Sequence, residues 1–326
     1  MDVSIVRGIS VCIVACTLAA PGMGALAQSY PNRPIRLVVA VPPGGSTDVI
    51  ARIVGARLSE RVGQQVVIDN RSGAAGLIGI ELVVRALADG HTLLIGAGSL
   101  GTINAMVPAA RFNAQKDLAP IAMLGTSPYV LVVQPALPVK TVAELVAHAR
   151  ANPGKLDFAG STPGSLQRLA GEHLNRMAGI DLLYVPYKGT GQVIPDLLAG
   201  RLQVAFDNVL ILAPYVRSGA LRALAVTGAT RSAIMPELPT IAEAGIPGFQ
   251  AAGWFGAFGP SATPTAVITR LNGEFTSLIQ EPSIRDRLVA QGMDPITGTP
   301  ELLRAHLARE IEKWGKLIRE TGLTLQ

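Results

Sequence analysis

The chain is poor in the residues that disulfide-linked and metal-binding proteins require. Its 326 residues include only two cysteines, Cys12 and Cys16, and both lie close to the first residue. The four histidines are spread along the chain, and none forms a close pair or joins a cluster of carboxylates at metal-ligand spacing. We therefore predict a protein without a metal site or a cofactor, and one that uses no disulfide or thiolate chemistry.

Clustered positive charge and long apolar runs are also missing. Lysine and arginine number 28 against 23 acidic residues, and the net charge of +5 includes no dense basic run. Nucleic-acid binding usually needs such a cluster, so we expect no nucleic-acid partner. No apolar stretch reaches the roughly 20 residues that a membrane-spanning helix needs. Aromatic residues make up only 4% of a chain that is 49% apolar, a composition typical of compact α/β layers.

The first residues have the pattern of a signal peptide. An arginine precedes an apolar run at residues 9–20, and small residues lead to an Ala-x-Ala sequence that ends at Ala27. We predict that residues 1–27 are removed by cleavage near Ala27 and that the mature protein, which then has no cysteine, lies in the periplasm. Lipid anchoring at Cys16 is the alternative, because the residues before it loosely fit a lipoprotein cleavage box. The Ala-x-Ala site is better placed.

The rest of the chain alternates β-branched runs with helical patterns, which favours parallel sheets covered by helices. In the first part, strands are predicted at residues 35–41, 65–69 and 92–95, with a helix at 47–62 and another that ends near residue 88. In the second part, strands are predicted at residues 129–134, 156–159, 182–185, 204–206 and 221–227. Only helices are predicted after Phe258, and the last runs from Pro300 to about Thr321.

Two lobes are expected for a mature chain of roughly 300 residues, because one hydrophobic core becomes inefficient at that length. The helices after Phe258 need a sheet to cover, and we assign them to the first lobe. The predicted lobes are residues 28–128 with 254–326, and residues 129–253. This is the α/β construction of a two-lobed, type II-like periplasmic binding protein, with a mainly parallel sheet flanked by helices in each lobe and a two-segment hinge. Ligands bind between such lobes, at the carboxyl ends of the strands.

The most suggestive motif ends the first predicted strand and opens the first helix. Its candidate ligand-binding residues are Pro43, Gly44, Gly45, Ser46, Thr47 and Asp48. The two glycines let the main chain approach a ligand closely, and free N–H groups at a helix start favour an anion. Ser46 or Thr47 is expected to cap the helix and to donate a hydroxyl. An ordinary capped turn is the alternative explanation.

A second loop of the same kind lies in the other predicted lobe, again between a strand and a helix. Its candidate ligand-binding residues are Ser161, Thr162, Gly164 and Ser165. Strand ends supply the further candidates Ser99, Lys188, Gly189 and Asp207. Lys188 could pair with a carboxylate, whereas Asp207 would accept a hydrogen bond from a hydroxyl or an amine. Helix capping and lobe packing are the alternative roles.

Two catalytic motifs overlap near the third strand. Gly96, Gly98 and Gly101 match the GxGxxG dinucleotide pattern, but they follow the third strand rather than the first, and a poor helix comes next. Ser99 lies in a sequence that lacks only the first glycine of a hydrolase nucleophile elbow, and His306 is the only late histidine. A periplasmic serine hydrolase is therefore a second hypothesis, and a structural envelope protein without a ligand is a third.

Several short motifs follow one another along the mature chain. In the first half they are Tyr30-Pro31, Pro42 to Asp48, Asn70-Arg71, Asp89-Gly90 and Lys116-Asp117. In the second half they are Val185 to Gly189, Phe206 to Asn208, Leu221 to Thr227, Pro239-Thr240 and Trp254 to Gly256. This order resembles that of the solute receptors of tripartite tricarboxylate transporters, the Bug family, and the resemblance covers essentially the whole mature chain.

The resemblance implies a periplasmic receptor, not an enzyme, that takes up di- and tricarboxylates, aromatic acids or acidic amino acids for integral membrane transporter subunits. We expect a monomer. The family binds carboxylates through main-chain amides and hydroxyls of two facing loops, often with bridging waters. This chain departs from the usual pattern near the expected cleft at Pro163, Arg168, Leu100, Gly101 and Leu77. The sequence therefore predicts a carboxylate receptor without naming its carboxylate.

Overall fold

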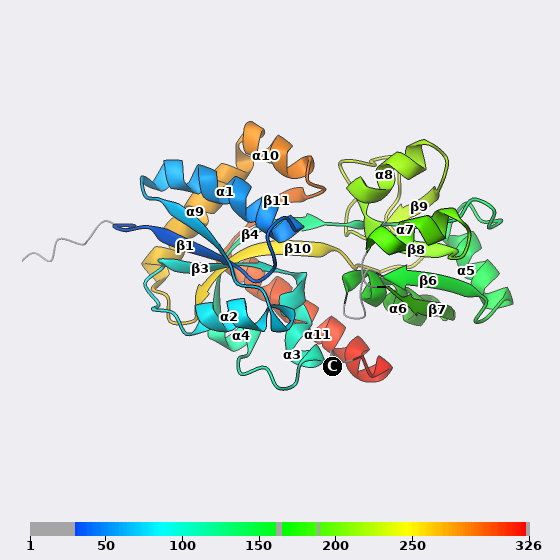
Figure 1. Cartoon of the computed structure of the whole chain (residues 1–326), viewed down its shortest axis with the longest axis horizontal. Coiled ribbons are helices and arrows are strands. Elements are labelled where there is room, and N and C mark those ends of the chain that lie inside the picture. Colours follow the sequence, from blue (N-terminus) through cyan, green and yellow to red (C-terminus); the bar gives the residue numbers. More distant parts are fainter. Residues whose placement is uncertain (1–29, 161–164, 188–189, 324–326) are drawn as a thin grey trace, which may run out of the picture.

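The computed structural model describes residues 30–160, 165–187 and 190–323, which form two lobes side by side (Figure 1). Each lobe is built on one β-sheet with helices on both faces. None of the helices in these ranges has both the length and the apolar character that crossing a membrane requires. Five candidate site residues lie outside the described ranges: Ser161, Thr162, Gly164, Lys188 and Gly189.

The first sheet has six strands in the order β11-β4-β10-β3-β1-β2. They are β1 (Ile35–Val39), β2 (Val66–Asn70), β3 (Thr92–Ala97), β4 (Leu118–Ser127), β10 (Gly253–Pro260) and β11 (Asp294–Gly298). β1 is parallel to β2 and β3, whereas β10 is antiparallel to β3 and β4, and β11 is antiparallel to β4. This sheet is mixed rather than mainly parallel, because β10 enters it from the side of the other lobe and runs against its neighbours.

Helices cover both faces of the first sheet. On one face lie α1 (Ser46–Val62), α9 (Thr265–Gln280) and α10 (Pro282–Val289), and on the other lie α2 (Leu77–Val84), α3 (Ile103–Met106), α4 (Ala114–Asp117) and α11 (Pro300–Thr321). β1 shows why both layers are needed. Ile35, Leu37 and Val39 pack into the first layer, while Val38 packs into the second, and all four are fully buried. Such continuous apolar runs are typical of strands that are covered on two faces.

The second sheet has five strands in the order β7-β6-β8-β5-β9. They are β5 (Tyr129–Val133), β6 (Leu156–Gly160), β7 (Leu182–Pro186), β8 (Val204–Asn208) and β9 (Arg222–Val226). β6 is parallel to β7 and β8, whereas β5 is antiparallel to β8 and β9, so this sheet is mixed as well. One face is covered by α5 (Val142–Ala151), α6 (Leu166–Ala178) and the end of α11, and the other by α7 (Thr190–Leu198) and α8 (Val209–Arg217).

Several predicted helix limits are confirmed by their end signals. Gly63 ends α1 in a left-handed conformation, with φ of 65°. The capping box that opens α5 is present, because Thr141 Oγ1 accepts a hydrogen bond from the Glu144 N–H at 3.1 Å. α11 begins with Pro300 after the capping residue Thr299. These signals are local, so the sequence alone carries them.

The prediction that only helices follow Phe258 is wrong. β11 pairs with β4 there, and Pro295 and Gly298 interrupt the alternating pattern by which a strand is recognised. The two sheets are joined where β4 passes into β5 after Ser127, and the chain returns to the first sheet at Gly253. The two-segment connection is thus present, while the residue limits of the lobes stay a prediction.

The last helix belongs to both lobes. Leu303 and Leu307, in the first half of α11, pack into the core beside the first sheet. Trp314, Leu317 and Ile318, in its second half, pack into a core of the second sheet. Figure 1 shows this helix, in red, passing from one lobe toward the other. α11 is therefore a third connection between the lobes, made by packing and not predicted from the sequence.

Candidate functional site

A cleft of about 380 Å³ lies between the two lobes, at the ends of strands from both sheets. The first sheet supplies the loop after β1, the end of β3 and the start of β10. The second supplies the start of β5 and the end of β8, with the first turn of α6 beside them. Ligands of α/β proteins bind at such strand ends, so this cleft is the candidate binding site.

The loop between β1 and α1 is held by the carboxylate of Asp48. This side chain is buried and accepts hydrogen bonds from the Gly44 N–H at 2.9 Å and from Asn70 Nδ2 at 3.0 Å. Arg52, one helical turn later, donates to it at 3.0 Å. Asn70 also donates to the Val41 carbonyl at 3.1 Å. Two side chains thus fix the path of the loop between the strand and the helix.

These contacts change both the protonation and the predicted role of Asp48. The hydrogen bond from Arg52 is the main cause that lowers the pKa of Asp48 to about 2, so this carboxylate stays ionised. The prediction that Ser46 or Thr47 caps α1 is wrong, because the capping residue is Gly45 and no side chain caps this end of the helix. Asp48 supports the loop from behind instead of lining the cleft.

Three helices begin at the cleft, namely α1 after Gly45, α6 after Ser165 and α8 after Asn208. The amino end of a helix carries a partial positive charge and N–H groups without partners inside the helix. Ser165 Oγ accepts from the Arg168 N–H at 3.3 Å, and Asn208 Oδ1 accepts from the Leu210 N–H at 2.9 Å. Because α1 has no such side-chain cap, its first main-chain N–H groups are available at the cleft.

Side chains of the second lobe form a hydrogen-bonded group on the opposite wall. The buried Asp207 carboxylate accepts from the Asn208 N–H at 2.7 Å and from Gln167 Nε2 at 3.4 Å. Asn208 donates to Ser127 Oγ at 3.0 Å, and Ser127 donates to the Gly292 carbonyl at 3.0 Å, which links the second lobe to the first. Asp207 is the only Asp, Glu, Lys or Arg among the described residues that line the cleft.

Two aromatic side chains add hydrogen-bond donors to the cleft. Trp254, on β10, is 1% exposed, and its indole N–H has no acceptor within the described part of the chain. The nitrogen lies close behind Gly98, where a Cβ atom would come within 3.7 Å of it. Burial and the Asp207 carboxylate raise the pKa of Tyr129, so its hydroxyl stays protonated. Since a buried indole N–H usually has a partner, Trp254 is a candidate donor to a ligand.

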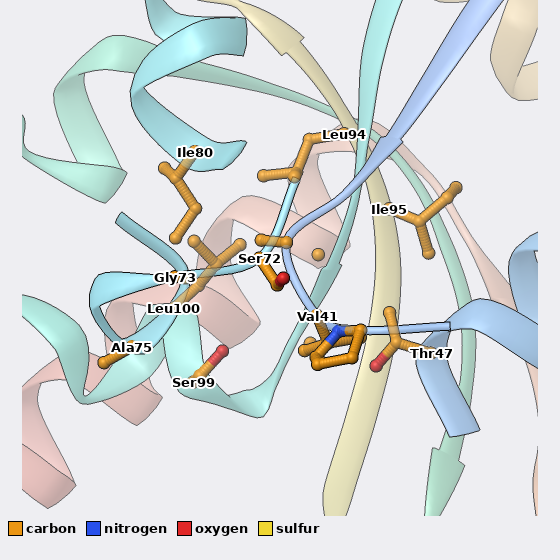
Figure 2. Close-up of a pocket in the computed structure, with 15 residues that line it drawn as sticks. Val41, Thr47, Ser72, Gly73, Ala75, Ile80, Leu94, Ile95, Ser99 and Leu100 are labelled. Carbon is orange, nitrogen blue, oxygen red and sulfur yellow. The ribbon is translucent and has the colours of Figure 1, made fainter. Parts of the chain in front are cut away.

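Beside the cleft lies a cavity of about 550 Å³ within the first lobe (Figure 2). Val41, Thr47, Ala97 and Ser99 line both spaces, so the two lie side by side. The residues around this cavity, drawn in Figure 2, come from the end of β3, from the first turns of α1 and α2, and from the loops after β1, β2 and β3. The candidate site therefore has a polar part between the lobes and a second part inside one lobe.

The structure brings some of the predicted site residues together and places others behind them. Those that line the cleft are Gly45, Ser46, Thr47, Ser99 and Asp207. Those that lie beside it are Pro43, Gly44, Asp48 and Ser165. Gly44 and Ser165 take part in the helix starts just described, and Pro43 is exposed on the loop. Their direct contact with a ligand stays a prediction.

Sequence reasoning missed Ser127, Gln167 and Trp254 as lining residues. Ser127 and Trp254 stand where the chain was predicted to cross between the lobes. Because crossing strands border the cleft in a hinged protein, those positions were themselves a usable signal. Gln167 lies in the first turn of α6, and nothing in the sequence around it distinguishes it from a solvent-exposed helical residue.

Arg168, one of the departures from the family pattern, lies in the first turn of α6 and does not line the described cleft. Its guanidinium carbon lies 4.2 Å from the centroid of the Tyr184 ring. Its Nε lies 3.6 Å from the Glu172 carboxylate. The charge is thus held against the flank of α6 by a cation–π contact and an ion pair.

The hydrolase hypothesis finds no support in the surroundings of His306. Its ring packs edge-on against Trp254, with centroids 5.1 Å apart, and burial lowers its pKa.

No group of three or more His, Cys, Asp or Glu side chains suited to a metal ion occurs among the residues that the structure describes.

Two α/β lobes that enclose a cleft at their strand ends define a periplasmic solute-binding protein. Within that class, the chain belongs to the tripartite tricarboxylate transporter family of receptors, whose sequence pattern matches residues 50–323. It is similar to BugT of Bordetella pertussis, with 37% identity over 320 residues that cover 98% of this chain and 97% of that protein. The family consists of binding proteins, not enzymes.

Two solved structures show the same fold with a ligand. Rpa4515 of R. palustris, solved with adipate, has a TM-score of 0.74 and 37% identity and covers 90% of this chain and 99% of its own. MatC of Rhodopseudomonas palustris, solved with malate, has a TM-score of 0.69 and 30% identity and covers 89% of this chain and 100% of its own. Both ligands are carboxylates, and both belong to those proteins.

Proposed function

We propose that this receptor captures a small carboxylate in the cleft between its lobes. The observation that carries the proposal is the uncapped amino end of α1, where Gly45, Ser46 and Thr47 line the cleft. The partial positive charge and the main-chain N–H groups of that helix end suit an anion. The hydroxyls of Ser46 and Thr47 add donors that an ionised carboxylate can accept.

The composition of the cleft supports binding by dipoles rather than by an ion pair. No lysine or arginine is found among its described lining residues, and Asp207 is engaged with Asn208 and Gln167. A carboxylate held at the start of α1 would lie on the first-lobe side, away from the wall that carries this acid. Rpa4515 with adipate and MatC with malate support the choice of a carboxylate.

We further propose that the protein acts in the periplasm after removal of residues 1–27, as a monomer that delivers its ligand to integral membrane transporter subunits. The sequence pattern before Ala27 supports export. Membership of a transporter receptor family supports the membrane partner. Closure of the two lobes around the ligand would give the transporter a surface that differs between the free and loaded receptor.

A panel of carboxylic acids tests the proposed ligand class. An acid present at 100 times its dissociation constant stabilises the folded state by about 2.7 kcal/mol, which thermal melting detects readily. Thr47→Val removes a hydroxyl from the cleft while keeping the side-chain shape, and we expect it to weaken binding. Thr92→Val, at the other end of β3, is the matched control and leaves binding unchanged. If no acid of the panel raises the melting temperature, the carboxylate proposal is wrong and a structural role gains support.

A further inference from the structure

The cavity behind the cleft has walls of a different chemistry from the cleft itself. Ile80, Leu94, Ile95 and Leu100 supply its largest side chains. Of its described lining residues none carries a charge, and Thr47, Ser72 and Ser99 are the ones with a hydroxyl. A carboxylate or an ammonium group would give up part of its hydration here without an ionic partner, which is unfavourable. A hydrocarbon group would lose only the water around apolar surface, which is favourable.

The cavity is formed by close packing that glycines permit. A Cβ atom on Gly96 would come within 2.5 Å of Leu100 Cδ1, so the absence of a side chain there leaves room for Leu100 in the wall. A Cβ atom on Gly79 would come within 2.7 Å of the Arg71 carbonyl oxygen and within 2.9 Å of Ala40. The start of α2 therefore lies directly on the loop after β1, and the two loops frame the cavity.

The segment after β2 adopts a costly conformation at the cavity wall. Ala74 and Ala75 have φ angles of 46° and 56°, in the left-handed region that residues with a side chain rarely adopt. Gly73 and Gly76, on either side of them, also have positive φ. Strained backbone of this kind persists where the surroundings hold it, and it gathers at ligand sites. Ser72 and Ala75 of this segment line the cavity (Figure 2).

We infer that the ligand is a monocarboxylate with a hydrocarbon portion, aliphatic or aromatic, that fills this cavity. The inference rests on the proposed carboxylate function. Thr47 borders both spaces, so an acid group held at the start of α1 has its hydrocarbon directed past Thr47 and Ala97 into the first lobe. An apolar cavity of about 150 Å³ already accommodates benzene. The 550 Å³ available here suits a ring with a side chain or an extended alkyl chain.

Matched pairs of acids test the inference by isothermal titration calorimetry. Propanoate, butanoate, hexanoate, octanoate and 3-phenylpropanoate form the monocarboxylate series, and adipate and suberate are the dicarboxylates of equal length. We expect affinity to rise roughly fourfold for each added methylene group. Each dicarboxylate should bind at least about 30-fold more weakly than the monocarboxylate of its length, because its second charge enters an apolar space.

A substitution that fills the cavity tests whether the hydrocarbon chain of the acid binds there. Ser72 is exposed on the cavity wall, so Ser72→Trp reduces the space without disturbing the buried core. We expect this variant to flatten the length series, with octanoate weakened roughly tenfold or more. Ser261→Trp, at an exposed position of the first lobe away from the cleft, is the matched control and keeps the full length dependence. Melting temperatures confirm that both variants fold.

The outcomes separate this inference from the function on which it rests. Rising affinity with chain length that Ser72→Trp abolishes supports the hydrocarbon site. If adipate binds as tightly as hexanoate, or if affinity does not change along the series, the hydrocarbon site is wrong while carboxylate capture stands. If none of the acids binds, both proposals are wrong.

Discussion

The two walls of the cleft present different parts of the protein to a ligand. On the first-lobe side, the proposed binding groups are main-chain N–H groups and hydroxyls at the start of α1, with an apolar cavity behind them. On the second-lobe side, the groups are side chains, because Asp207, Gln167 and Asn208 form a hydrogen-bonded set. Main-chain N–H groups bind any carboxylate, so under this proposal selectivity on the first side would depend on the shape of the cavity. On the second side it depends on which side-chain donors are already engaged.

The two walls also differ in how they are supported. The first is fixed by Asp48 and Asn70, which lie behind the loop and are not part of its surface. The second is fixed by its own surface residues, since Asn208 both lines the cleft and caps α8. Substitutions behind the first wall should therefore affect stability and binding together. On the second wall, Asn208 both faces the cleft and caps α8, so a substitution there changes the cleft surface and the helix cap together.

The largest expected effect is that of Asp48→Ala. The substitution leaves the Gly44 N–H and Asn70 Nδ2 without their acceptor and removes the partner of Arg52. We expect the free energy of unfolding to fall by about 3 kcal/mol, since several hydrogen bonds to a buried charge are lost. Carboxylate affinity should fall as well, because the loop is released. Urea denaturation and calorimetry measure the two changes, with the exposed Asp286→Ala as control. Loss of affinity at unchanged stability would contradict a supporting role.

The same residue predicts a dependence of stability on pH. The pKa of Asp48 is lowered to about 2 from an ordinary value of 3.8, so folding favours its ionised form. A carboxylate of this kind contributes stability above about pH 4, and the contribution is lost as the pH falls toward 2. Asp48→Asn should therefore be less stable than the unmodified protein at pH 6, with the difference shrinking between pH 4 and pH 2. Thermal melts across that range measure it, and a difference that stays constant would show that the charge of Asp48 is not responsible.

A smaller effect is expected for Trp254→Phe, which removes the indole N–H and keeps most of the ring packing. If the N–H donates to the ligand, affinity should fall about tenfold, the equivalent of one hydrogen bond of about 1.4 kcal/mol. The melting temperature of the free protein should change little, because the N–H has no acceptor among the described residues. Titration calorimetry with the tightest acid measures the change. Equal affinity in both proteins would place Trp254 in the packing of β10 alone.

The smallest expected effect is that of Ser165→Ala, at the start of α6 beside the second wall. Ser165 caps α6 through the Arg168 N–H, so its loss should lower the free energy of unfolding by about 1 kcal/mol. Ser165→Asn keeps a capping side chain and should restore most of this stability. If Ser165→Ala abolishes binding without any change in the free energy of unfolding, Ser165 contacts the ligand directly. Both sides of the cleft would then bind the ligand through a helix start and a hydroxyl.

The elements that the sequence predicted well are those with local signals. α1 and α11 begin and end close to the predicted residues, because glycine at position 63 and the Thr299-Pro300 pair act within one turn of the chain. The missed strands β4, β10 and β11 lack such signals. β10 contains three glycines and ends in proline, so only its neighbours in the sheet make it a strand.

The candidate site also has a part that local sequence signals predict and a part that depends on tertiary packing. The loop at Gly45 to Thr47 was predicted because a glycine-rich turn before a helix has a recognisable chemistry. The pairing of Asp48 with Gly44, in place of a cap by Ser46, depends on how the loop curls and was not predicted. The cavity beside Leu100 could not be predicted at all, because a cavity is a property of packing among residues far apart in the sequence. Trp254 was missed because its place in the cleft wall depends on how β10 pairs with β3 and β4.

α11 has a consequence for how the two lobes lose their packing. Leu303 and Leu307 finish one hydrophobic core, while Trp314, Leu317 and Ile318 finish another. Displacement of this one helix would therefore open a hydrophobic core in each lobe at once, so we expect the packing of these two cores to be lost together.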